Sequence, residues 1–343
     1  MCYLIIVSLR ILTYNNNKVV LIERSTKLTN KKNLSFYVKL GVSCTAGIFL
    51  FNKILTIKSI KKERLYSNNS NFFNWKFGRV FYTVNGTGSP ILLIHDLSCD
   101  SSGYEWNKIV NELSKKYTVY TIDLIGCGRS DKPNLTYTNY MYVQLISDFI
   151  KNVIKQKTGI IATGLSSSIC TMVCYIEPQL IDNLILVNPT SLKELSKIPN
   201  SSNKILKKII ESPLLGTFLY NGYSSEFNIR RRFQKKIFYN KNNFSKKIAQ
   251  AYCEAAHLSG TSSKYVLSSL CANFVNININ HALKQINNNI TIIVGEHVPD
   301  SEQIVGYYSS LNPSIEVDIL PNAKYLPQLE DPQLFLSTCM IYL

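Results

Sequence analysis

The chain has 343 residues, of which 45% are apolar, with 21 Tyr and 15 Phe, so it can bury one large core and is neither disordered nor fibrous. Lys and Arg outnumber Asp and Glu by 38 to 22, for a formal charge of +16. No basic stretch is interleaved with aromatic side chains, so we expect no nucleic-acid partner.

Nine cysteines are spread along the chain without a Cys-x-x-C pair, and only four histidines are present. The odd number and the apolar surroundings of several cysteines favour reduced thiols in a cytoplasmic-type compartment over a disulfide framework. No histidine stands at zinc-ligand spacing from a cysteine pair, so we expect no metal site. No motif indicates a cofactor either.

The N-terminal part differs in composition from the rest. Residues 1–33 form a basic leader, and residues 34–55 hold an apolar run, 34–51, that Lys39 interrupts. The run is near the lower length limit for a transmembrane helix, so it predicts a membrane anchor and a membrane-associated protein. A leader that stays on the chain and a soluble amphipathic helix are the alternatives. Residues 56–74 are predicted to be a linker.

Strands alternate with helices over residues 75–190. The predicted strands are 78–84, 91–96, 117–124, 159–163 and 181–189, and the predicted helices are 106–116, 137–155 and 166–176. The run 91–96 is continuously apolar up to its polar end, as in a strand that both faces of a parallel sheet bury. This order predicts an α/β fold with a doubly wound, mostly parallel sheet.

Residues 191–285 break this alternation. They are basic, helical in pattern and lack a buried strand, which predicts a helical cap inserted into the core. The core resumes over 286–343, with strands at 290–296 and 314–320 and a helix at 332–343. The basic run 230–236 in the cap predicts a solvated helix face, with contact to anionic lipid as the alternative.

Three segments resemble the α/β-hydrolase fold superfamily. They are "LLIHDLS" (92–98), "DLIGCGRSDKP" (123–133) and "GLSSS" (164–168), in the family's order and at its spacing. The resemblance covers the chain from residue 77 onward and implies an α/β-hydrolase fold with a helical cap and hydrolase activity on a small or lipid-like molecule.

The resemblance makes Ser166 the candidate nucleophile. The family's G-x-S-x-G corner lifts a serine from a sharp strand-to-helix turn, and Gly164 and Ser168 stand at the two small positions around it. A serine hydroxyl needs a neighbouring base to become a nucleophile near neutral pH.

The same resemblance assigns the oxyanion hole. It predicts the backbone N–H groups of Leu97 and Ser167 as donors to the developing negative charge. Asp96 stands where the family has glycine, so it brings a carboxylate near the hole.

The positions of the other two triad members carry unusual residues. Val298 stands at the acid position and Tyr325 at the histidine position of a segment that otherwise matches the family. A tyrosine with an ordinary pKa near ~10 is a poor general base. Asp300 is the nearby substitute for the acid. His257 in the cap and His297 at the end of a strand are the candidate substitute bases, although an ordinary packed histidine is the alternative for each.

Two hypotheses of different classes follow. The first is a serine hydrolase of an ester, thioester or lipid-like acyl substrate with Ser166 as nucleophile. The second is a non-catalytic member of the superfamily that binds a ligand or partner in the same pocket, since both the acid and the histidine are replaced. An enzyme of this fold that needs no triad is a third alternative.

Overall fold

The computed structural model describes residues 14–15, 18–19, 31–67 and 69–343. They divide into two compact units, Met1–Ile48 and Phe49–Leu343. The first unit holds the antiparallel pair β1 (Tyr14–Asn15) and β2 (Lys18–Val19). Most of the leader predicted at 1–33 lies outside the described residues.

Helix α1 (Lys31–Ile60) covers the segment predicted as a membrane anchor, residues 34–55. Among residues 14–15, 18–19, 31–67 and 69–343, no helix is both long enough and apolar enough to cross a membrane. The structure therefore does not support the predicted transmembrane helix, in a segment that Lys39 interrupts and Lys53 follows.

The segment predicted as a linker, 56–74, is more ordered than expected. It contains the end of α1 and most of strand β3 (Asn71–Trp75), which pairs with β4 (Gly78–Asn85) in an antiparallel hairpin. The sequence Asn-Phe-Phe-Asn-Trp does not alternate regularly between apolar and polar residues, so it was not predicted as a strand.

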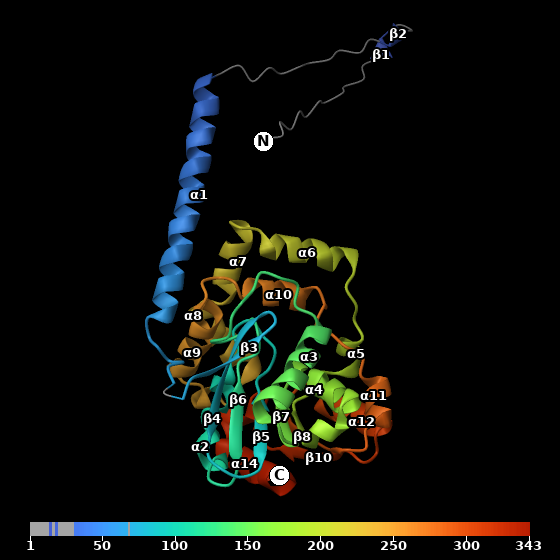
Figure 1. Cartoon of the computed structure of the whole chain (residues 1–343). Coiled ribbons are helices and arrows are strands. Elements are labelled where there is room, and N and C mark those ends of the chain that lie inside the picture. The colour runs from blue at the N-terminus through green and yellow to red at the C-terminus, as the bar shows by residue number, and fades with distance from the viewer. Residues whose placement is uncertain (1–13, 16–17, 20–30, 68) are drawn as a thin grey trace. The chain divides into compact units, whose positions relative to one another are not determined.

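An eight-stranded sheet organises the second unit (Figure 1), in the order β10-β9-β8-β7-β5-β6-β4-β3. Neighbouring strands from β10 to β6 are parallel, and β4 and β3 are antiparallel to their neighbours. The predicted doubly wound, mostly parallel sheet is confirmed. Its other strands are β5 (Pro90–Ile94), β6 (Thr118–Ile122), β7 (Thr158–Thr163), β8 (Ile181–Val187), β9 (Asn289–Gly295) and β10 (Glu316–Leu320).

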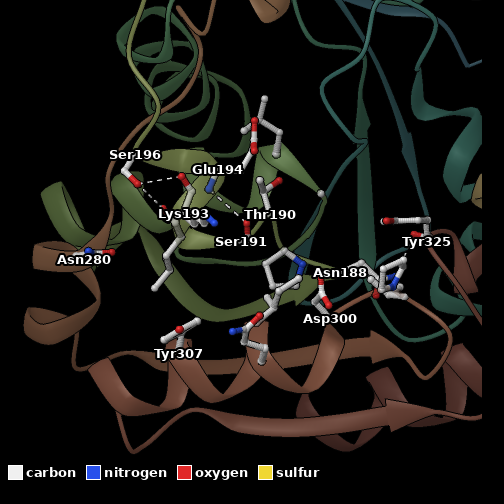
Figure 2. A pocket seen from close by; sticks show the side chains of 18 of the residues that line it. Asn188, Thr190, Ser191, Lys193, Glu194, Ser196, Asn280, Asp300, Tyr307 and Tyr325 are labelled. Carbon is white, nitrogen blue, oxygen red and sulfur yellow. Dashed lines mark hydrogen bonds between the residues drawn. The ribbon is translucent and has the colours of Figure 1, made fainter.

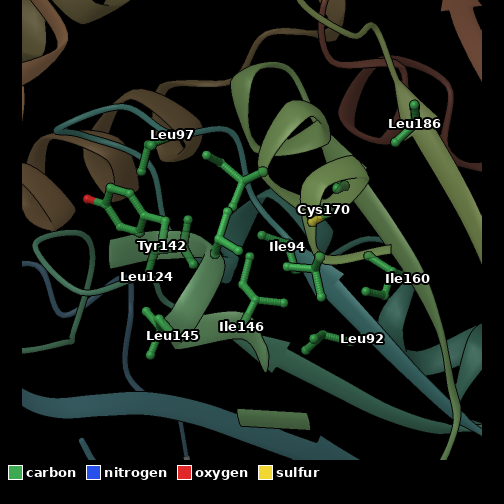
Figure 3. Packing of buried hydrophobic residues seen from close by; sticks show 14 of the residues in the cluster. Leu92, Ile94, Leu97, Leu124, Tyr142, Leu145, Ile146, Ile160, Cys170 and Leu186 are labelled. Atoms are coloured by element: carbon green, nitrogen blue, oxygen red, sulfur yellow. The ribbon is translucent and has the colours of Figure 1, made fainter. Parts of the chain in front are cut away.

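Helices cover both faces of the sheet, because successive residues of each central strand point to opposite sides. In β5, Leu92 and Ile94 belong to the core cluster that includes Ile146 of α3 and Cys170 of α4 (Figure 3). Ile91 and Leu93 of the same strand belong to a second cluster with Trp106 and Phe335, on the other face.

Fourteen helices are labelled along the described residues. Those after α1 are α2 (Val110–Leu113), α3 (Asn139–Phe149), α4 (Leu165–Ile176), α5 (Leu192–Leu195), α6 (Ser201–Glu211), α7 (Leu215–Tyr223), α8 (Glu226–Arg232), α9 (Lys246–His257), α10 (Lys264–Cys271), α11 (Asn280–Gln285), α12 (Ser301–Leu311), α13 (Pro327–Glu330) and α14 (Pro332–Tyr342). The helix predicted at 106–116 is shorter than expected, since only α2 and a preceding 3-10 turn form there.

The chain between β8 and β9 contains α5 to α11, at the place where the helical cap is predicted. All residues from 191 to 285 are described, and none of them forms a strand. This helical layer lies beyond the carboxyl ends of the parallel strands, which is where open α/β sheets bind their ligands (Figure 1).

Candidate functional site

The turn between β7 and α4 is made at Gly164, with φ 57° and ψ −124°. Residues with a side chain rarely adopt such torsions. A Cβ on Gly164 would also come within 2.3 Å of Oδ1 of Asp96. In a hydrolase elbow the nucleophile occupies the strained residue of the strand-to-helix turn. Here that residue is glycine, so the turn presents no nucleophilic side chain.

Ser166, the predicted nucleophile, lies inside the first turn of α4 rather than at the elbow. Its side chain is fully buried, and Oγ donates a hydrogen bond to the carbonyl oxygen of His95 at 2.7 Å. The residue with the strained torsions, Gly164, thus lies two residues before the predicted nucleophile. The small residues around the true turn at Gly164 are Ala162 and Ser166.

The hydroxyl groups of the two following serines also bond to the backbone. Ser167 Oγ donates to the carbonyl oxygen of Ala162 in β7 at 2.9 Å, and Ser168 Oγ donates to that of Leu165 in α4 at 2.8 Å. The G-x-S-x-G pattern can be placed on this segment in two ways, with either Gly164 or Ser166 at its central position. Because the pattern asks for a serine at its centre, the sequence favoured the placement on Ser166. The signal that distinguishes them is Gly164 itself, directly after the last residue of β7, because glycine tolerates positive φ.

The carboxyl group of Asp96 occupies the place of the oxyanion. Leu165, the residue after the elbow, donates its backbone N–H to Asp96 Oδ1 at 2.9 Å, and the backbone of Leu97 also hydrogen bonds to this carboxyl. Leu97 thus faces the predicted hole, but Ser167 does not, since its N–H donates to the Gly164 carbonyl at 3.2 Å. Burial raises the pKa of Asp96 to about 6, against the opposing effect of the two backbone donors.

His95 holds the loop that carries Asp96. Its Nε2 accepts the backbone N–H of Leu124 at 3.0 Å, so Nδ1 carries the proton that it donates to the Asp96 carbonyl oxygen at 2.7 Å. The ring is fully buried, and burial lowers its pKa, which keeps it neutral. Its role is structural.

A small cavity of about 190 Å³ lies beside Asp96 and is lined by further carboxylates. Glu105 accepts the backbone N–H of Asp96 at 3.0 Å, and burial raises its pKa well above the usual range. Asp100, also in the lining, forms an ion pair with Arg232 of α8. The cavity therefore combines one paired carboxylate with two enclosed acids whose pKa values burial raises.

A wider cavity of about 920 Å³ (Figure 2) also has Asp96 in its lining. Its walls come from the segment that runs from the end of β8 into α5, from α12, and from the loop at Tyr325. Asp96, Gly164, Asn188 and Tyr325 line both cavities, so the two meet at the elbow.

Asn188 ties three segments together at the rim of the site. It follows β8 with φ 45°, a torsion that asparagine tolerates better than most residues. Its Nδ2 donates to the carbonyl oxygens of Lys324 and Tyr325 at 2.8 and 3.0 Å, and its Oδ1 accepts the N–H of Gly295 at 2.9 Å. One buried amide therefore fixes the ends of β8 and β9 and the loop that carries Tyr325.

Val298, Asp300 and Tyr325 all line the wide cavity, so the structure brings the replaced acid and histidine positions close to the elbow. Burial, with a smaller effect from Asp300, raises the pKa of Tyr325, which makes its phenol an even weaker base at neutral pH. Over the described residues that line the two cavities, no side chain is histidine.

The two candidate substitute bases lie elsewhere. His257 is buried in α9, with Nδ1 2.7 Å from the Cys253 carbonyl oxygen and Nε2 3.2 Å from Asn221 Oδ1, and it lines a separate cavity. His297 stacks on Tyr239 with 3.7 Å between ring centroids and is partly exposed. Neither histidine lines the two cavities that meet at Gly164.

Several residues of the site were not predicted from the sequence. Glu105 bonds to Asp96, Arg232 pairs with Asp100, and Asn188 bonds to the loop at Tyr325, yet the three residues are far apart in the chain and belong to no motif. Asp96 itself was identifiable, because it replaces a family glycine. In the part of the chain that the structure describes, no three His, Cys, Asp or Glu side chains form a metal-binding group.

Comparison with known proteins points to one family. A family model described as alpha/beta hydrolase fold matches residues 89–211. The chain is similar to an uncharacterised protein of Mycobacterium tuberculosis, with 33% identity over 31% of each chain. It is 27% identical to the 2-hydroxy-6-oxo-6-(2'-aminophenyl)hexa-2,4-dienoic acid hydrolase of Metapseudomonas resinovorans, over 32% of this chain and 39% of that one. The chain thus spans about a third of the length of the curated relatives it matches.

Solved structures extend the likeness of fold beyond that segment. A serine hydrolase involved in carbazole degradation superposes with a TM-score of 0.64 at 16% identity, over 80% of this chain and 97% of that one. An epoxide hydrolase superposes with a TM-score of 0.62 over the same shares, also at 16% identity. At such identities these structures share the fold.

Proposed function

Because the chain belongs to the α/β-hydrolase fold superfamily, we propose that it uses the hydrolase cavity to bind a small molecule without a serine triad. One observation carries this proposal. The strained residue of the elbow is Gly164, and the N–H group of Leu165 next to it donates to the chain's own Asp96.

The three positions that carry the nucleophile, acid and base of a catalytic triad hold other residues here. A glycine offers no nucleophile, a valine offers no acid, and a tyrosine with a raised pKa offers no base. The alternative that Ser166 is the nucleophile conflicts with its full burial and with its hydrogen bond to His95. Catalysis through Ser166 would require the start of α4 to unwind.

The cavity suits a small organic ligand. Its volume of about 920 Å³ is in the range of ligand pockets in proteins, and apolar side chains alternate in it with hydroxyl and amide groups. The named relatives include hydrolases of a dienoic acid and of an epoxide, which supports a small molecule as the ligand class.

A fluorophosphonate probe tests the absence of an activated serine. We expect no labelling of the wild-type chain and none of Ser166→Ala, while an active serine hydrolase in the same reaction is labelled. Labelling of the wild type that disappears in Ser166→Ala would overturn the proposal.

Ligand binding is tested separately by thermal-shift screening of small molecules. Leu165→Trp and Thr190→Trp place bulk in the wide cavity, so they should remove the shift that a true ligand causes. Ile341→Trp, at an exposed position of α14, is the matched control and should leave that shift unchanged.

Asp96 supports a second candidate function. A carboxyl group with a pKa of about 6 that lines a cavity is suited to accept and return a proton, as in an enzyme that needs no triad. A ligand that is converted by the wild type and bound but not converted by Asp96→Asn would favour this function over simple binding.

A further inference from the structure

The outer helices of the cap, α6 and α7, expose apolar side chains that the fold leaves uncovered. We call this set the apolar cap face: Ile205, Leu206, Ile209, Leu214, Leu215, Phe218 and Leu219, each between 39% and 61% exposed. In Figure 1 the two helices lie on the far side of α10 from the sheet. Contiguous apolar surface of this kind in a folded protein marks an interaction site.

The geometry of the two helices places these side chains together. Ile205 and Ile209 are one turn apart on α6, and Leu215, Phe218 and Leu219 form one stripe on α7. Gly216, in the first turn of α7, lies against the end of α6, because a Cβ there would come within 2.1 Å of the carbonyl oxygen of Ile210.

Side chains outside the apolar cap face attach α6 and α7 to the rest of the fold. The two helices pack on the rest of the cap through the buried side chains of Ile210 and Tyr220, and the Tyr220 hydroxyl donates to the Ala256 carbonyl oxygen at 2.7 Å. The apolar face also continues beyond the cap, because the ring of Phe51 on α1 lies 6.0 Å from that of Phe218.

Charge identifies the partner. α6 and α7 contain Lys204, Lys207 and Lys208 and a single acid, Glu211, which Lys207 neutralises in an ion pair. Apolar side chains flanked by exposed lysines are typical of helices that lie in the surface of a bilayer.

A basic cavity begins where α7 ends. It measures about 480 Å³ and includes Asn221 of α7 in its lining. Its charged residues are the bases Lys58, Lys62, Arg230 and Lys246 and the single acid Glu226. Such an excess of positive charge next to an apolar surface complements the phosphate groups of anionic lipids.

We propose that α6 and α7 insert the apolar cap face into the outer layer of an anionic lipid bilayer, with the basic cavity facing the lipid headgroups. This surface is separate from the cavity at Gly164, so the inference does not depend on the proposed function.

An introduced tryptophan reports insertion at the face itself, whatever other part of the chain binds lipid. The full-length chain with Leu215→Trp is mixed with vesicles of phosphatidylcholine and about 30% phosphatidylserine whose acyl chains carry bromine, a contact quencher. The native Trp75 and Trp106 are buried, so the contact quencher cannot reach them and their emission stays constant. We expect strong quenching of the added indole emission, and none for the matched control Ile176→Trp at an exposed position of α4.

Bromolipid quenching that is absent for Leu215→Trp, or equal for Ile176→Trp, overturns the proposal. So does a change in indole emission that depends on protein concentration without vesicles, because it would mean that a second copy covers the face. Circular dichroism of both variants verifies that they are folded.

A second pair of variants tests the basic cavity. Lys62→Gln combined with Arg230→Gln should weaken binding to phosphatidylserine vesicles roughly tenfold or more, since each basic residue near the surface contributes to attraction. Lys115→Gln combined with Lys155→Gln removes the same charge at exposed positions outside the cap and should change binding little. Equal effects of the two pairs would overturn the role of the cavity.

Discussion

Two enclosed carboxyl groups, Asp123 and Asp96, lie close to the same histidine, His95. Their pKa values nevertheless shift in opposite directions. Burial alone would raise the pKa of Asp123, but the Arg129 guanidinium and several hydrogen bonds outweigh it, and the pKa ends below its ordinary value. Asp96 has only backbone donors, and its pKa rises to about 6. The family loop at Asp123 is thus built for stability, whereas Asp96 at the elbow destabilises the fold when it ionises.

The largest effect is expected from breaking the stable pair. Arg129→Met leaves the fully buried Asp123 carboxylate without its ion-pair partner, which should lower the free energy of unfolding by about 3–5 kcal/mol. Urea denaturation measures the loss. Arg79→Met, which removes a surface pair with Asp131, is the control and should cost at most about 1 kcal/mol. Equal losses would contradict the view that the Asp123 loop is a structural centre.

The second prediction concerns the unpaired carboxyl. The folded protein keeps the Asp96 proton up to a pH of about 6, while the unfolded chain loses it near its ordinary pKa of 3.8. The folded state therefore binds more protons between these values, and stability falls as the pH rises through this window. Asp96→Asn removes the titration, so it should stabilise the protein by about 3 kcal/mol at pH 8 and by little below pH 4.

Denaturation midpoints of Asp96→Asn across this pH range give the measurement. Asp182→Asn, at an exposed position that pairs with Lys157, is the control and should show no comparable gain. If Asp96→Asn is no more stable than the wild type at pH 8, then other groups offset the cost of burying the ionised Asp96 carboxylate, and the prediction is contradicted.

Gly164→Ala should be destabilising by about 1–3 kcal/mol, because alanine is strained at φ 57° and its Cβ would collide with Asp96. The cost should shrink in the double variant with Asp96→Gly, where the collision is absent. Gly222→Ala is the control, since its added Cβ meets nothing within 4 Å. Thermal denaturation of the wild type, Gly164→Ala, Asp96→Gly and the double variant measures the coupling between the two positions. If the losses of stability are simply additive, backbone strain alone sets the cost of Gly164→Ala.

The smallest effect is expected at Ser166. Ser166→Ala removes one buried hydrogen bond to the His95 carbonyl, which should cost about 1 kcal/mol of stability. Ligand binding, followed by the thermal shift it causes, should not change. Loss of ligand binding in Ser166→Ala would show that this serine takes part in the functional site.

The sequence predicted most of the core but not the details of the site. Continuous apolar runs such as 91–94 identify buried parallel strands, because few other elements this short bury both faces. The register of the elbow depends on a single backbone torsion at Gly164, which no hydrophobic pattern encodes. The contacts of Asp96 with Glu105, and of Asp100 with Arg232, join residues that are neighbours only after folding.

The Asn188 amide has a consequence for how such a site can change over evolutionary time. It holds residue 325 through backbone carbonyl oxygens, and the backbone N–H of residue 325 donates to the Ile237 carbonyl oxygen at 3.1 Å. None of these hydrogen bonds depends on which side chain residue 325 carries. A tyrosine and a histidine can therefore occupy this position with the same backbone hydrogen bonds, so the chemistry at residue 325 can change while those bonds are kept.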